Sequence, residues 1–127
     1  MRALLVTHGR LSEALVESAR AVAYADAPIE AMTNDGASAD DIRRRVEEWL
    51  AIEDGPCLIL VDVGGGSCGT AACLAVGNRR DVWVLGGVNL PMVITFVSSY
   101  ANLAPQDLVT KMLDRALNAV GLLGSHS

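Results

Sequence analysis

Hydrophobic residues form four short apolar runs, separated by stretches in which apolar positions repeat at helical spacing. The runs predict strands at Ala3–Val6, Ile29–Met32, Cys57–Val61 and Val82–Leu85. The first, third and fourth runs are continuously apolar rather than alternating, which is typical of parallel strands covered on both faces. Strands that alternate with helices predict an α/β fold with an open, mainly parallel sheet and helices on both faces.

Each helical stretch has an apolar stripe of its own. The second begins at Ser38, with Asp41 three residues later as in a capping box, and its "RRR" and "EE" groups have the spacing of a solvated outer face. A third helix is expected from Ser67 to Val76, and Pro91 begins a fourth. The stripes of the first, second and last helices comprise, in turn, Leu11, Ala14, Leu15, Ala19 and Val22; Ile42, Val46, Trp49 and Leu50; and Leu108, Val109, Met112, Leu113, Leu117 and Val120.

Composition limits the classes of protein that fit. The 127 residues are 51% hydrophobic and contain no repeat or linker, which predicts a single domain over residues 1–127. A formal net charge of −5 argues against nucleic-acid binding, which needs a basic face. No run approaches the ~18 apolar residues of a membrane span, and "MRALLV" is too short for a signal peptide. We therefore expect a cytoplasmic protein.

The three cysteines form no C-x-x-C pair. Cys57 and Cys73 lie in apolar surroundings, where cysteine usually acts as a small buried hydrophobe. The remaining soft ligands considered are His8 and the tail residue His126, so no metal site is expected.

Polar and glycine-rich segments follow three of the predicted strands. His8 ends the first strand, Asp62 ends the third, and "GGVNLPM" follows the fourth. Ligands of open α/β sheets bind beyond the carboxyl ends of the strands. In the flavodoxin-like strand order 2-1-3-4, strands one and three are neighbours and His8 meets Asp62. A Rossmann order instead places strand four beside strand one, and the pattern leaves both orders open.

A histidine beside a carboxylate suits nucleophilic chemistry. Neutral imidazole, with an ordinary pKa of about 6.5, is a usable nucleophile near neutral pH, and Asp62 would fix its tautomer and stabilise the cationic ring. The loop "GGGSCGT" has glycines that let backbone N–H groups approach an anion, and Ser67 can cap the following helix. Each feature has a simpler interpretation: a capping histidine, an aspartate that caps a turn, and a flexible connection. The loop is neither a Walker A sequence nor a nucleophile elbow.

Three segments together resemble the mannose-type IIA domain of the bacterial sugar phosphotransferase system. "VTHGRLSEALVESA" resembles its N-terminal block, whose T/S-H-G turn carries the phosphoryl group on histidine. "LILVDVGGGSCGTAA" resembles its D-x-x-G-G-S-P-x-N-A-A block, and "VLGGVNLPMVI" resembles its G-V-N-[LI]-P-M block. The three blocks keep the family's order over nearly the whole chain.

The resemblance implies roles for individual residues. His8 would be the phosphohistidine site and Asp62 its orienting carboxylate, with Thr7 in the same turn. The remaining site residues it implies are Ser67 with the Gly65 and Gly66 backbone as phosphate contacts, and Thr7, Asn89 and Pro91 at the rim that meets the partner. It also implies strand order 2-1-3-4 and a homodimer in which a C-terminal strand crosses to the partner. "VGLLG" is the candidate for that strand, or else a frayed helix end, and apolar surface of Met92–Val97 and Leu108–Val120 is expected at the dimer interface.

The sequence departs from the family at Gly64, Cys68 and Thr70, where a bulky residue, proline and asparagine are usual. These changes adjoin the phosphate loop and bear on partner choice and transfer rate more than on phosphorylation itself. Cys68 is either a redox-sensitive thiol at a helix N-terminus or a small residue tolerated in a loop.

The function implied is that of a phosphotransferase component with a phosphohistidine intermediate. His8 would accept a phosphoryl group from the phosphocarrier HPr and pass it to a cysteine or histidine of a IIB component, without cofactor or metal. A membrane would be reached only through a permease complex, and the sugar is left open. Two alternatives are a regulatory phospho-acceptor without onward transport and the phosphoryl donor subunit of a dihydroxyacetone kinase system.

Overall fold

Four strands and five helices alternate along residues 1–125, the part of the chain that the computed structural model describes. The strands are β1 (Arg2–Thr7), β2 (Ile29–Thr33), β3 (Cys57–Val61) and β4 (Val82–Leu85). The helices are α1 (Leu11–Ala23), α2 (Ala39–Ile52), α3 (Ser67–Val76), α4 (Leu90–Ser99) and α5 (Pro105–Asn118). All four predicted strands are confirmed, with β1 longer at both ends and β2 longer at its carboxyl end.

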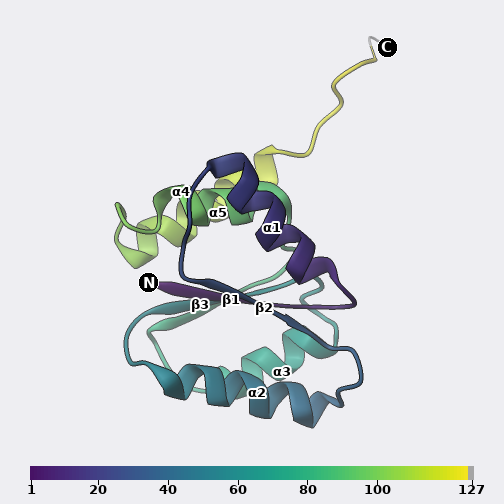
Figure 1. Ribbon diagram of the computed structural model, residues 1–127, viewed down its shortest axis with the longest axis vertical. Coiled ribbons are helices and arrows are strands. Elements are labelled where there is room, and N and C mark those ends of the chain that lie inside the picture. Colours follow the sequence, from purple (N-terminus) through teal and green to yellow (C-terminus); the bar gives the residue numbers. More distant parts are fainter. Residues whose placement is uncertain (126–127) are drawn as a thin grey trace.

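The strands form one parallel sheet in the order β2-β1-β3-β4. Central strand β1 pairs with β2 on one side and β3 on the other, so that Leu5 lies opposite Ala31 and Leu60. Figure 1 shows α1, α4 and α5 on one face of the sheet and α2 and α3 on the other. The predicted α/β class and the order 2-1-3-4 are confirmed, and the Rossmann order is excluded.

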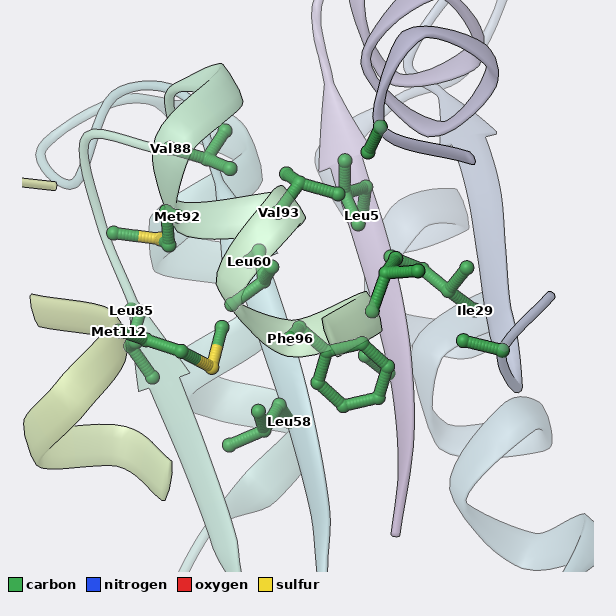
Figure 2. Packing of buried hydrophobic residues seen from close by; sticks show 14 of the residues in the cluster. Leu5, Ile29, Leu58, Leu60, Leu85, Val88, Met92, Val93, Phe96 and Met112 are labelled. Carbon is green, nitrogen blue, oxygen red and sulfur yellow. The ribbon is translucent and has the colours of Figure 1, made fainter. Parts of the chain in front are cut away.

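Apolar side chains fill both faces of the sheet because successive strand residues point to opposite sides. Leu5 and Leu60 belong to the cluster beneath α4 and α5, which Figure 2 shows around Phe96. Val6 and Ile59 belong to the cluster covered by α2 and α3. Burial of each such side chain contributes about 1.5–3 kcal/mol, which explains why these strands are continuously apolar.

Helix α2 follows its sequence pattern closely. The capping box is confirmed, since the Asp41 N–H donates to Ser38 Oγ and the Ser38 N–H donates to the Asp41 carboxylate. Its predicted stripe is buried. The "RRR" and "EE" groups lie on the outer face, where Arg43 pairs with Glu47 and Arg44 with Glu48. The predicted solvated face is therefore confirmed.

The predicted stripe of α1 is confirmed at Ala19, which is buried, and at Leu15, which packs against the core, but it is wrong at its other positions. The buried residues of this helix are Ser12, Val16 and Ala19, whereas Leu11 and Val22 are exposed. Ser12 can be buried because its N–H donates to Thr7 Oγ1 and its hydroxyl donates to the Met32 carbonyl. Ser12, whose hydrogen bonds are satisfied, thus takes the buried position that the hydrophobic pattern assigned to Leu11.

The second half of the predicted α5 stripe is also wrong for the single chain. Leu108, Val109 and Met112 are buried, whereas Leu113 and Leu117 are exposed within the helix and Val120 is exposed beyond its end at Asn118. Residues 120–124 are in neither helix nor strand and extend away from the sheet (Figure 1). This segment forms no strand within the single chain, and His126 lies outside the described residues.

The cysteines differ in their surroundings. Cys57 is fully buried in β3, as predicted, but Cys73 is exposed because it faces away from the side of α3 that packs on the sheet. The expectation that Cys73 is buried is wrong.

Within residues 1–125, no helix combines the length and apolar character needed to cross a membrane.

Candidate functional site

The carboxyl ends of β1 and β3 bring His8 and Asp62 into direct contact. His8 Nδ1 lies 2.9 Å from Asp62 Oδ2, and the His8 backbone N–H donates to the same oxygen at 3.0 Å. The other carboxylate oxygen, Oδ1, accepts from the Val63 N–H at 3.0 Å. Asp62 is thereby held by both oxygens in the orientation that faces the ring.

This contact determines which nitrogen of His8 carries the proton. An ionised carboxylate only accepts hydrogen bonds, so Nδ1 carries the proton and Nε2 keeps the lone pair. The His8 side chain is 48% exposed, whereas that of Asp62 is 11% exposed. The imidazole ring is therefore open to a partner molecule, and the carboxylate that orients it is shielded.

The pKa of Asp62 lies below its ordinary value. Burial raises this pKa, but the hydrogen bonds from the His8 backbone, the His8 ring and the Val63 N–H lower it by more, with a smaller contribution from the charge of His8. Asp62 is thus ionised at neutral pH and stabilises positive charge on the ring.

The phosphate-loop candidates lie beside the ring. The Gly66 N–H donates to the Val63 carbonyl in a tight turn, and a Cβ placed on Gly66 would lie 3.7 Å from His8 Cε1. Helix α3 starts at the next residue, so its positive N-terminal end is adjacent to the imidazole. Gly65 and Ser67 are exposed at the same loop. This arrangement suits an anion held next to His8.

Ser67 does not cap α3, contrary to expectation. The N-cap residue is Gly66, and Ser67 is the first residue of the helix without a capping hydrogen bond from its side chain. Its hydroxyl is thus left exposed rather than engaged by the helix terminus.

Glycines on two sides fix the position of the loop. A Cβ on Gly69 would lie 2.4 Å from the Gly64 carbonyl oxygen, and a Cβ on Gly86 would lie 3.2 Å from Gly64 Cα. The loop therefore packs tightly against α3 and against the segment after β4. A Cβ on Gly64 itself meets nothing within 4 Å, so the bulky residue usual in the family would find open space there.

Thr7 and Asn34 support the turn that carries His8. Thr7 is fully buried, where its hydroxyl accepts from the Ser12 N–H, so it forms no exposed rim. Asn34, which was not predicted from the sequence, accepts from the Gly9 N–H through Oδ1 and donates its own N–H to the Thr7 carbonyl. Its place just after β2, at the same edge of the sheet as His8, is the signal that could have identified it.

Asn89 and Pro91 are placed at the start of α4. Asn89 Oδ1 accepts from the Met92 N–H and caps the helix, while its Nδ2 donates to the Ala116 carbonyl of α5. Pro91 lies in the first turn of α4. Asn89 thus links α4 to α5, and both ends of its amide have structural partners.

Cys68 lies close to the His8–Asp62 pair. Its thiol is fully buried, and burial raises its pKa; the negative charge of Asp62 adds to the rise, against the opposing hydrogen bond of Ser67. These surroundings disfavour the thiolate, so the structure does not favour the redox-sensitive interpretation of Cys68.

A 2-1-3-4 sheet with a histidine–aspartate pair beyond its central strands fits the class of phosphotransferase-system IIA components. The sequence matches the profile described as "PTS system fructose IIA component" over residues 2–113. The chain belongs to this family, EIIA-man, which confirms the resemblance to mannose-type IIA proteins.

Solved structures of IIA components have the same fold. The mannose/sorbose-specific IIA subunit from Enterococcus faecalis is 25% identical, with a TM-score of 0.83 and coverage of 99% of this chain and 96% of that one. Component EIIA from Streptococcus agalactiae is 22% identical, with a TM-score of 0.85 and coverage of 94% and 95%. The IIA protein associated with the fucose utilization operon of Streptococcus pneumoniae is 17% identical, with a TM-score of 0.82 and coverage of 95% and 91%. No curated protein sequence gives a significant match.

Proposed function

We propose that this phosphotransferase component is a phosphocarrier that accepts a phosphoryl group from phospho-HPr on Nε2 of His8 and passes it to a IIB component. The observation that carries the proposal is the 2.9 Å contact between His8 Nδ1 and Asp62 Oδ2, which leaves Nε2 with its lone pair on a half-exposed ring. Membership of the EIIA-man family supports the same chemistry.

In the proposed step, the Nε2 lone pair attacks the phosphorus atom of the donor phosphohistidine. A new P–N bond forms on His8 while the donor P–N bond breaks and its electron pair returns to the donor imidazole. Asp62 stabilises the cationic ring that results. In this proposal the loop amides before α3 and the exposed Ser67 hydroxyl donate hydrogen bonds to the transferred oxygens. Transfer to a cysteine or histidine of IIB reverses these steps, and neither step uses a cofactor.

We further propose where in the cell the protein acts. Residues 1–127 act as one IIA domain in the cytoplasm and contact a membrane only through the permease complex that IIB serves. The net charge of −5 fits protein partners rather than nucleic acid.

We also propose a homodimer formed through the C-terminal segment. Leu117, Val120 and Leu123 are 76%, 82% and 100% exposed in the single chain. Neighbouring apolar side chains this exposed to water are typical of a protein–protein interface. A groove of about 500 Å³ between the segment after β4 and α5 lies beside them. Its position fits a second copy's residues 120–124. The expected contribution of Met92–Val97 is withdrawn, because most of that segment is buried within its own chain.

The direct test is to incubate the protein with phosphoenolpyruvate, enzyme I and HPr and to measure its intact mass. We expect one added phosphoryl group on the wild-type chain, none on His8→Ala, and slower addition on Ser67→Ala. Labelling of His8→Ala would overturn the proposal. Adding a IIB component then separates carrier from regulator, since only a carrier loses its label to IIB.

A further inference from the structure

A third side chain with a metal-binding atom joins the His8–Asp62 pair. Among residues 1–125, a ring nitrogen of His8, a carboxylate oxygen of Asp62 and Cys68 Sγ all lie within 4.8 Å of one another. They come from the ends of β1 and β3 and from the second residue of α3, three segments fixed by the sheet order. The cluster is therefore set by the fold rather than by one flexible loop.

We propose that His8, Asp62 and Cys68 bind a thiophilic divalent cation such as Zn²⁺, and that this cation and the phosphoryl group compete for His8. Imidazole, carboxylate and thiolate are the ligands that Zn²⁺ prefers, and three protein ligands plus water make an open tetrahedral site. Mg²⁺ and Ca²⁺ prefer oxygen ligands alone and are disfavoured by the sulfur atom.

The distances are compatible with such a site after a small adjustment. Bonds of about 2.0 Å to nitrogen and oxygen and about 2.3 Å to sulfur place tetrahedral ligands about 3.3–3.5 Å apart. The His8–Asp62 contact of 2.9 Å has to open slightly, and the widest pair in the cluster, within 4.8 Å, has to close by about an ångström. The cation enters from the half-exposed ring of His8, while the fully buried Cys68 closes the inner side.

Binding changes the protonation of the ligands in a defined way. The Cys68 thiol releases its proton to solvent as its sulfur bonds to the metal. A neutral imidazole has one lone pair and one N–H. Whichever nitrogen binds the cation, the other carries the proton, so no lone pair is left to attack a phosphoryl group. A phosphorylated His8 in turn has lost the lone pair that the metal needs, and the two states exclude each other.

Metal binding is tested on the intact chain by titration with Cd²⁺, whose bond to thiolate gives a near-ultraviolet charge-transfer band. Cys73, exposed on the same helix, gives the matched control. We expect a 1:1 band in wild type and in Cys73→Ala, its loss in Cys68→Ala and in the isosteric Cys68→Ser, and at least tenfold weaker binding in His8→Ala. Absence of the band from wild type, or its loss in Cys73→Ala with retention in Cys68→Ala, would overturn the site.

Competition is tested by the rate of phosphorylation with and without Zn²⁺, taken as a ratio within each variant. This arm rests on the proposed function, whereas the Cd²⁺ titration does not. We expect at least tenfold inhibition of wild type and Cys73→Ala and none of Cys68→Ala. Equal inhibition of all three would overturn the competition by assigning it to the donor proteins. A metal-free wild type that takes no label while the Cd²⁺ band persists would overturn the proposed function and uphold the metal site.

Discussion

The proton on His8 decides what this residue can do. Three hydrogen bonds hold the Asp62 carboxylate, and the one to Nδ1 keeps the proton on that nitrogen. The opposite nitrogen is then unprotonated without a separate base. A lone histidine in solution divides its proton between the two nitrogens, so Asp62 contributes orientation as well as charge.

Replacing Asp62 by asparagine tests that contribution. The amide can donate to Nδ1 and so favour the unreactive tautomer, and it cannot stabilise a cationic ring. We expect Asp62→Asn to fold and to be phosphorylated by phospho-HPr roughly tenfold to a thousandfold more slowly, measured by quenched-flow labelling. Unchanged kinetics would contradict the assigned role.

Because the pKa of Asp62 is lowered, the His8–Asp62 pair stabilises the fold by an amount that depends on pH. A carboxyl whose pKa is lower in the folded state stabilises the fold fully above its ordinary pKa of about 4, and this stabilisation is lost as the pH falls through the folded value. Wild type should therefore exceed Asp62→Asn by about 1 kcal/mol at pH 7, with the difference shrinking below about pH 4. Urea unfolding at a series of pH values measures it. A difference that is constant or grows towards acid would contradict this.

At the scale of elements, the loop of Gly64–Gly66 is held in position by close contacts with two neighbouring glycines that have no side chains. α3 approaches Gly64 so closely that Gly69 leaves no room for a side chain, and the segment after β4 approaches so closely that a Cβ on Gly86 would be tight. The loop therefore has one position next to His8, although its own glycines permit many conformations.

Two alanine substitutions distinguish the effect of moving the loop from the effect of reducing its flexibility. Gly69→Ala places a Cβ 2.4 Å from the Gly64 carbonyl oxygen and must shift the loop, whereas Gly64→Ala meets nothing within 4 Å. We expect Gly69→Ala to lose about 1–3 kcal/mol of unfolding free energy and at least tenfold in phosphorylation rate, with little effect of Gly64→Ala. Equal behaviour of the two variants in denaturation and labelling would refute this account of the loop.

The strands and α2 could be predicted because their burial follows hydrophobicity directly. The first helix could not, because Ser12 replaces hydrophobic burial with two hydrogen bonds to residues outside the helix. In the same way, the meeting of His8 and Asp62 followed from the strand order, once the family resemblance selected it. The supporting contacts of Asn34 and the packing of Gly69 depend on loop conformation, which no periodic pattern encodes. The sequence left open whether Cys68 is a reactive thiol at a helix N-terminus or a tolerated loop residue, because its full burial depends on how α3 begins.

At the scale of the whole molecule, the single chain leaves Leu117, Val120 and Leu123, at and beyond the end of α5, exposed to solvent. We expect sedimentation to show a dimer at micromolar concentration, and Leu117→Glu together with Leu123→Glu to convert it to monomer. Leu74→Glu is the control, because Leu74 is 54% exposed on α3 in the opposite layer and should leave the dimer intact. A wild-type monomer, or dissociation by Leu74→Glu alone, would contradict the proposed interface.

The chemical form of the labelled protein tests the central claim most directly. Phosphohistidine is hydrolysed in acid and survives alkali, whereas phosphoserine behaves in the opposite way. The two phosphohistidine isomers can also be distinguished after alkaline digestion. Labelling through HPr should give one acid-labile phosphoryl group per chain, bonded to Nε2 of His8. A label that survives acid, or that is found on Ser67, on His126 or on Nδ1 of His8, would contradict the assignment of Nε2 as the nucleophile that Asp62 orients.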